Sequence, residues 1–324
     1  MTRVSVTPAA PLDIAPGLLP PDAILRGPSM HRFGHRAMAS LFEILCVHPD
    51  QALVRAAADQ AFDVLDRLEA DLSRFIDNSD VSRINNQRAG ESVKVGRWTM
   101  ECLLLARTAW EETGGAFDIS LGTGLHHLDL DPRDYTVRAR ASGIRIDLGG
   151  IGKGYAVDRM ADVLEEWGIR HALIHGGCSS VRALEPPPGL KGWPLRIAMA
   201  QPEAACLVEY SASQCVLSAS GLKKGNHIVD PRTGLAAAGR PAVWVAAPTT
   251  ALLPVVREIG PIGACREALL QSPCAVAEVH STAYLILNRE EIDACRSRVP
   301  GLETWLAEPD GVRQSPHYSL VHLT

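Results

Sequence analysis

The sequence lacks any uninterrupted apolar run near the roughly 20 residues that a membrane-spanning helix needs. It also lacks an excess of basic residues: 32 Lys and Arg stand against 37 Asp and Glu, so it has no basic stripe of the kind that general nucleic-acid binders use to neutralise phosphates. Its eight cysteines contain no CxxC pair, which argues against a zinc ribbon or a dithiol redox motif. A globular protein with neither a nucleic acid nor a membrane as partner remains, and nothing in the 324 residues fixes its oligomeric state.

The N-terminal segment 1–30 is rich in Pro and Ala, but it has no continuous apolar core of a signal peptide and no cysteine that could carry a lipid. Free cysteines without an export signal favour a reducing compartment. We therefore expect a cytoplasmic protein, with a periplasmic one as the less favoured alternative. Because the segment carries little periodic signal, we expect residues 1–35 to form a poorly ordered arm and residues 36–324 to form a single domain.

Hydrophobic spacing along the rest of the chain mixes short strands with amphipathic helices. We expect one compact α+β body, with mixed or antiparallel sheets flanked by helices. The expected helices cover 51–75, 99–112, 155–167 and 249–273, and the expected strands cover 40–47, 144–148, 171–175, 195–199, 206–210, 215–218 and 242–247.

The strongest single segment is DLGGIGKGYAVD at 147–158. Glycines between a strand and a helix let backbone N–H groups approach an anion, and the start of the helix adds a favourable dipole. Lys153 would supply a point charge for a phosphate. The spacing matches neither GxGxxG nor GxxxxGK[ST], which excludes the Rossmann and Walker interpretations. Taken alone, a structural turn with an exposed lysine explains the segment slightly better.

Three further segments carry reactive side chains, and each has a simpler structural explanation. In TGGAFD, Asp118 could reach a ribose or an adenine amine, although Gly-Gly also simply ends a helix. His227 precedes the turn DPRTG, and a histidine beside a strand is more often a surface or hydrogen-bonded residue than a base. Glu278, Ser281 and Thr282 share a helix face and offer the oxygen ligands that Mg²⁺ prefers, although a lone ExxST is not specific.

Taken together, these segments resemble the FAD:protein FMN transferase family, the ApbE-like flavin transferases, over roughly residues 36–312. Each motif is modest alone, whereas five of them in the right order are highly specific. The motifs are TGGAFD at 113–118, DLGGIGKGYAVD at 147–158, GG at 176–177, SG at 220–221 followed by HIVDPRTG at 227–234, and AEVHSTA at 277–283.

The resemblance implies FAD bound in a central cleft of an α+β fold, with Mg²⁺ on its diphosphate. The implied reaction moves FMN from FAD to a Ser or Thr hydroxyl of an acceptor protein and releases AMP. The metal would neutralise the charge that develops at the leaving AMP, while a base assists the attacking hydroxyl. The expected partner is therefore a flavin-acceptor protein with a Ser or Thr target.

The resemblance also implies a role for individual residues. His227 matches the proposed catalytic base, Met38 matches a methionine against the flavin, and Phe75 would stack on the isoalloxazine or adenine. The implied FAD-binding residues are Met38, Phe75, Ala116, Phe117, Asp118, Gly149, Lys153, Tyr155, His227 and Ile228, and the implied metal ligands are the main-chain carbonyl of Gly152 and the side chains of Glu278, Ser281 and Thr282.

Several positions depart from the family pattern. Glu278 stands where the family usually has Asp, and Cys178 follows the Gly-Gly pair where an acidic or amide residue is usual. The connection between Gly221 and His227 is shorter than the family norm, and residues 249–273 are interpreted as an insertion. Two alternatives therefore stay open: an FAD pyrophosphatase that releases FMN and AMP, and a non-catalytic FAD-binding member of the family.

Overall fold

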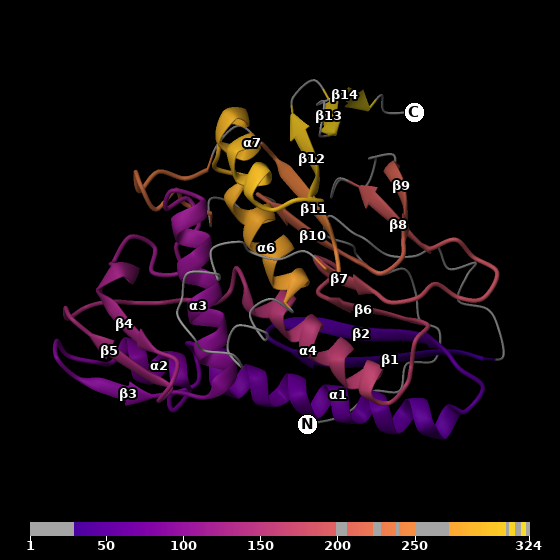
Figure 1. Ribbon diagram of the computed structural model, residues 1–324, viewed down its shortest axis with the longest axis horizontal. Coiled ribbons are helices and arrows are strands. Elements are labelled where there is room, and N and C mark those ends of the chain that lie inside the picture. The colour runs from indigo at the N-terminus through magenta and orange to yellow at the C-terminus, as the bar shows by residue number, and fades with distance from the viewer. Residues whose placement is uncertain are drawn as a thin grey trace.

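The structure is a computed structural model (Figure 1). It describes residues 29–198, 206–222, 228–237, 240–250, 272–308, 311–314 and 319–321. Residues 1–28, which make up most of the expected arm, and 251–271, which make up most of the expected insertion, lie outside the described residues.

The main sheet has nine strands, and all of its neighbouring pairs are antiparallel. Both of its faces are covered, so its central strands are apolar at successive positions: in β11, Val243 and Val245 belong to the core on one face and Trp244 to the core on the other. In spatial order the strands are β1 (Met30–Ala37), β2 (Ser40–Val47), β6 (Ala172–Gly176), β7 (Ser180–Ala183), β10 (Cys215–Gly221), β11 (Ala242–Pro248), β12 (Glu303–Glu308), β13 (Gly311–Gln314) and β14 (Ser319–Val321).

Three helices cover one face of this sheet: α1 (Gln51–Leu72), α4 (Gly152–Glu166) and α6 (Pro273–Ala283). α4 contacts both α1 and α6, and α6 also packs on β10 and β11 (Figure 1). The side chain of Asp50 starts α1 by accepting the N–H of Leu53 at 3.0 Å, as an N-cap residue does. This arrangement brings the beginning of α4 beside α6.

Smaller elements complete the fold. The opposite face of the main sheet packs against β8 (Trp193–Ala198) and β9 (Cys206–Ala212), whose Trp193 shares a core with Trp244. A three-stranded sheet lies beside α3 at the left of Figure 1. The remaining elements are α2 (Asp80–Asn85), β3 (Ser92–Lys94), α3 (Arg97–Glu112), the 3₁₀ turn η2 (Leu125–His127), β4 (Leu128–Asp131), β5 (Thr136–Ala139) and α7 (Arg289–Arg298).

The structure confirms the predicted α+β class and corrects two local predictions. Residues 30–35 pair with β2 as part of β1, so they belong to the sheet and not to an arm. Residues 144–148 form no strand, although their apolar side chains alternate with polar ones in burial. Here the side chain of Asn85 makes the hydrogen bonds that a neighbouring strand would make. Its Nδ2 donates to the carbonyl of Ile146 at 3.0 Å, and its Oδ1 accepts the N–H of Ile146 at 2.7 Å.

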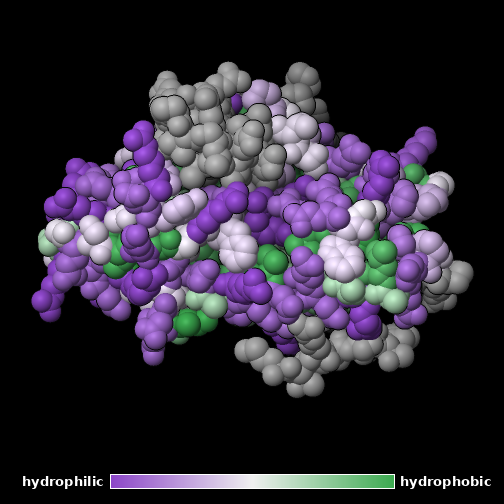
Figure 2. All heavy atoms as spheres, turned by 60° about the horizontal axis from the view of Figure 1, so that its bottom comes forward, coloured by the Kyte–Doolittle hydropathy of each residue, from purple (hydrophilic) through white to green (hydrophobic). Residues whose placement is uncertain are grey.

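The face that carries α1 is shown in Figure 2. Hydrophilic residues cover most of it, and the hydrophobic ones form small separate groups among them. Scattered hydrophobic residues of this kind are normal on globular proteins. In the part of the chain that the structure describes, no helix is long and apolar enough to cross a membrane.

Candidate active site

A cleft of about 480 Å³ lies at the beginning of α4. All five motifs contribute residues to it, although they are scattered along the sequence. Its lining residues are Ser40, Ala116, Phe117, Asp118, Ile119, Leu121, Asp147, Gly149, Gly150, Lys153, Gly177, Ser179, Ala219, Ser220, Gly221, Ile228, Val229, Pro231, Glu278, Thr282 and Ile286.

Glu278 of α6 brings a carboxylate to this cleft, which Asp118 and Asp147 also line, and the residue is only 4% exposed. The Nζ of Lys153 donates to its Oε1, and the backbone N–H of Gly154 donates to its Oε2 at 2.6 Å. Lys153 also donates to the carbonyl of Gly149 at 3.2 Å. A Cβ on Gly154 would stand 2.6 Å from the carbonyl oxygen of Cys274, so only glycine allows α4 and α6 to approach this closely.

Hydroxyl groups lie beside the carboxylate. The Oγ of Ser220 is 2.8 Å from the Oγ of Ser281 and 3.1 Å from the Oγ1 of Thr282. Ser220 and Thr282 line the cleft, whereas Ser281 is fully buried and bonds back to the carbonyl of Glu278 at 2.9 Å. The predicted metal ligands Glu278 and Thr282 therefore share one wall, and Ser281 supports it from behind.

The loop after α3 forms another wall through Ala116, Phe117 and Asp118. The Asp118 carboxylate accepts the N–H and the hydroxyl of Ser120, each at 2.7 Å, and the N–H of Gly122 at 3.0 Å. Asp118 therefore shapes its own loop. Its expected contact with the adenosine end of FAD stays a prediction.

Two aromatic residues of the predicted set do not line the cleft. Tyr155 is fully buried, its hydroxyl donates to the carboxylate of Glu101, and burial raises its pKa, so the phenol stays protonated in the core. The phenol is therefore turned away from the cleft, and the FAD contact that the resemblance implies for Tyr155 stays a prediction. Phe75 is 80% exposed and packs against its neighbour Arg74, whose guanidinium carbon lies 4.4 Å from the ring centroid. Flavin or adenine stacking by Phe75 stays a prediction.

Three other predicted residues need separate mention. Met38 is half-buried at a positive φ of 49°, and its N–H donates to Glu69 at 2.7 Å. It does not line the cleft, whereas Ser40 does. Gly152 is buried at the start of α4 and is not among the lining residues either. His227 lies outside the described residues, and the next residue, Ile228, lines the cleft.

The sequence interpretation missed the roles of Gly154 and Ser220. Ser220 lies in the SG motif, but a single serine gives no spacing from which a partner can be inferred. Gly154 follows Lys153 in the glycine-rich segment, but its need to be glycine depends on Cys274, which is distant in sequence. Both residues lie inside recognised motifs. Their roles depend on contacts with residues distant in the sequence, which the motifs alone do not reveal.

The donors of the cleft fit a hard divalent cation that shares its coordination with substrate. Within the described ranges, no group of three or more His, Cys, Asp or Glu side chains is arranged so that it could hold a metal ion by itself. The cleft is lined by three carboxylates, from Asp118, Asp147 and Glu278, and by hydroxyl groups that include those of Ser220 and Thr282. Mg²⁺ is commonly bound through one or two carboxylates together with waters and substrate phosphates. The residues present therefore fit Mg²⁺.

Comparison with known proteins agrees with this geometry. The chain matches the ApbE family over residues 38–127 and 121–253, and it belongs to that family. The FAD:protein FMN transferase of Salmonella typhimurium is 24% identical over 261 residues, which cover 66% of this chain and 73% of that protein. The protein of the same name from Treponema pallidum is 28% identical over 182 residues, which cover 46% of this chain and 49% of the relative.

The fold is also similar to that of a solved relative. The Pseudomonas stutzeri flavinyl transferase ApbE, in its apo form, superposes with a TM-score of 0.70. The match covers 89% of this chain and 94% of that chain, at 21% sequence identity. At this identity the similarity supports the fold, and the chemistry has to be argued from the site.

Proposed function

We propose that the protein is an enzyme that transfers FMN from FAD to a Ser or Thr hydroxyl of an acceptor protein, with Mg²⁺ as cofactor and AMP as the second product. Relatives named FAD:protein FMN transferase support this reaction class. One observation in the structure carries the proposal. The carboxylate of Glu278 meets Lys153 and the N–H of Gly154 in a cleft to which all five motifs contribute.

The cleft supplies what a dinucleotide needs. Gly149 and Gly150 present backbone to it next to the start of α4, where the helix dipole favours an anion such as a diphosphate. Lys153 adds a positive charge at the same place. Phe117 and Ile286 provide apolar surface for a ring system. These groups together suit a ligand such as FAD, which has a charged diphosphate in the middle and a planar ring system at each end.

The metal would be held by Glu278 and Thr282, with Ser281 and the main-chain carbonyl of Gly152 as the further ligands that the resemblance implies. An Mg²⁺ ion bound there would neutralise negative charge on the diphosphate oxygens. Glu278 can take this role when Lys153 turns from the carboxylate to the diphosphate. Ser220 fixes the hydroxyl of Thr282 at 3.1 Å, which holds that side chain in place.

The reaction itself exchanges one P–O bond for another. The acceptor hydroxyl oxygen forms a bond to the phosphorus of the FMN half, and the bond from that phosphorus to the bridging oxygen breaks. AMP leaves with the bridging oxygen, and the proton of the hydroxyl passes to a base. We assign this role to His227, which directly precedes the cleft residue Ile228. Nothing is oxidised or reduced.

The test incubates the protein with FAD and Mg²⁺, with and without an acceptor protein that carries a Ser or Thr target. AMP and free FMN are measured by chromatography, and covalent flavin is measured by fluorescence of the denatured acceptor. We expect AMP and protein-bound flavin in equal amounts, and only when acceptor and Mg²⁺ are both present. Free FMN and AMP without acceptor would identify a pyrophosphatase, and bound FAD without AMP at any Mg²⁺ concentration would identify a non-catalytic binder. Either result overturns the proposal.

A further inference from the structure

Helix α6, which carries Glu278 and Thr282, is capped at its N-terminus by another helix. Its own N-cap residue, Ser272, makes no side-chain capping bond. The buried carboxylate of Asp158 in α4 takes that place, with Oδ2 accepting the N–H of Cys274 at 3.0 Å and that of Ala275 at 3.2 Å. These N–H groups have no partner within their own helix, and a carboxylate at this end is favoured by the helix dipole.

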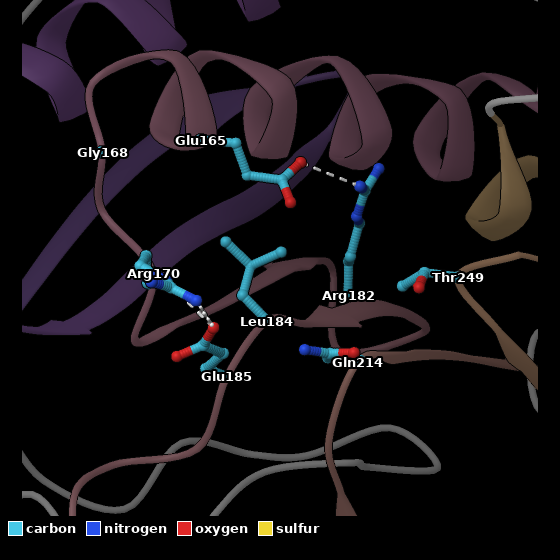
Figure 3. A pocket seen from close by; sticks show the side chains of 8 residues that line it. All are labelled: Glu165, Gly168, Arg170, Arg182, Leu184, Glu185, Gln214 and Thr249. Carbon is cyan, nitrogen blue, oxygen red and sulfur yellow. Dashed lines mark hydrogen bonds and ion pairs between the residues drawn. The ribbon is translucent and has the colours of Figure 1, made fainter.

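Asp158 is itself held from the main sheet. It is fully buried, and Nη1 of Arg182 in β7 donates to its Oδ1 at 3.1 Å. Figure 3 shows Arg182 reaching toward α4, where it also bonds Glu165 at 3.1 Å. A buried carboxylate without a counter-charge would be strongly unfavourable, so Arg182 is what allows Asp158 to cap α6 as an anion. One guanidinium thus joins β7 to the contact between α4 and α6.

This contact is in register with the contact made by Glu278. On α4, Asp158 is four residues after Gly154, and on α6, Cys274 is four residues before Glu278. Residues four apart lie on the same face of a helix, one turn from each other. The bonds Asp158–Cys274 and Gly154–Glu278 therefore lie one turn apart on both helices. Two such bonds fix both the rotation of α6 and its position along α4.

We propose that Asp158, held by Arg182, is a positioning residue that sets the carboxylate of Glu278 for metal binding. Asp158 touches neither the substrate nor the metal and acts through the placement of α6. This inference rests on the proposed function for its metal, whereas the placement itself can be measured on the free protein. Groups that orient metal ligands typically change metal affinity by about 10–100-fold when they are replaced.

The test compares Asp158→Asn with a matched control at the other end of the same helix. Arg240 donates to the carbonyl of Tyr284 at 3.0 Å and to that of Leu287, at the C-terminal end of α6. Arg240→Gln therefore removes a cap from α6 without touching the contact between Asp158 and Cys274. Two readouts are taken from the full-length protein: the exchange rate of the Gly154 amide hydrogen without ligands, and the Mg²⁺ concentration that half-saturates FAD binding, followed by flavin fluorescence.

We expect Asp158→Asn to speed exchange at Gly154 and to raise the half-saturating Mg²⁺ concentration about tenfold, with Arg240→Gln close to wild type in both. Equal behaviour of the two variants, or wild-type exchange at Gly154 in Asp158→Asn, overturns the inference. A wild-type protein whose FAD binding and AMP release are both independent of Mg²⁺ contradicts the proposed function, and the exchange readout still decides the positioning role. If Asp158→Asn does not fold, Arg182→Lys takes its place, because it weakens the hold on Asp158 while keeping the charge.

Discussion

The backbone N–H of Gly154 lies 2.6 Å from the Oε2 of Glu278. Gly154 is in the first turn of α4, where backbone N–H groups have no partner inside the helix. Glu278 supplies that partner from α6, and its charge lies at the positive end of the α4 dipole. One contact therefore completes a helix terminus and places a carboxylate in the cleft.

The first prediction concerns the absence of a side chain at Gly154. In Gly154→Ala, the new Cβ would meet the backbone of Cys274 at 2.6 Å, so α6 would have to move. We expect a loss of about 1–3 kcal/mol in the free energy of unfolding, as for other overpacked sites. Urea denaturation followed by circular dichroism measures it.

A matched control lies two residues earlier. A Cβ at Gly152 would meet no heavy atom within 4 Å, and Gly152 is likewise in the first turn of α4. Gly152→Ala should leave stability unchanged or raise it by up to about 1 kcal/mol, because alanine favours the helix. If both variants lose the same stability, close packing against Cys274 is not the reason for glycine at position 154.

The second prediction concerns the charge of Glu278. Glu278→Gln keeps the size of the side chain but removes the anionic ligand, and metal stabilisation of a phosphoryl transfer is worth several kcal/mol. We expect AMP release to fall by about 100-fold or more at fixed Mg²⁺, since about 1.4 kcal/mol corresponds to a factor of ten. FAD binding without Mg²⁺, measured by fluorescence, should change little, because the variant leaves the apolar and glycine contacts in place.

The conservative variant Glu278→Asp separates the effect of the charge of residue 278 from the effect of its side-chain length. Asp offers the same oxygen ligands as Glu, only closer to the backbone. We expect this variant to keep its Mg²⁺ dependence, with a turnover between those of wild type and Glu278→Gln. Loss of activity as complete as in Glu278→Gln would mean that the length of Glu278 matters as much as its charge.

Local patterns in the sequence were sufficient to predict most helices and strands. The spacing of apolar residues after Gln51 predicted α1, and Gly114 and Gly115 marked the end of α3. The segment 144–148 was misread because alternating burial also arises where a side chain, here Asn85, bonds an extended backbone. The pattern reports which residues are buried and does not report what pairs with the backbone.

The site was predicted less completely than the fold. The resemblance placed Lys153 and Glu278 in one site, and the structure brings them into contact. It also assigned Tyr155 to FAD without saying where its side chain lies, and the structure turns that side chain into the core, where its hydroxyl donates to Glu101. A motif marks which segments form a site, and the helical phase decides which of its side chains face the cleft.

The third prediction concerns His227, the residue to which we assign proton removal. His227→Ala removes a base without changing the charge of the cleft walls that the structure describes. General base catalysis contributes about 10²–10⁴-fold, so transfer to the acceptor should fall within that range. Transfer is measured at saturating FAD, with FAD binding followed by fluorescence, because the resemblance also implies a contact between His227 and FAD. If the variant transfers flavin at the wild-type rate, the proton leaves by another route.

The fourth prediction concerns a buried carboxyl group that does not line the cleft, that of Glu112 at the end of α3. Its carboxylate oxygens have no hydrogen-bond partner among the described residues, and burial raises its pKa from 4.5 to about 7, with Arg298 opposing the shift. Between these two values the unfolded chain binds fewer protons than the folded one, so the free energy of unfolding falls as the pH rises. The loss is complete above about pH 7.

Glu112→Gln should therefore be more stable than wild type at pH 8, by about 1–3 kcal/mol, and nearly equal to it at pH 4.5. The matched control is Glu111→Gln, since Glu111 is exposed on the same turn of α3 and should show no such difference. Urea titrations at several pH values compare the three proteins. A wild-type free energy of unfolding that rises between pH 5 and pH 7, with no difference from Glu112→Gln, would contradict this prediction, because a carboxyl group that stays protonated only in the folded state can only lose stability over that interval.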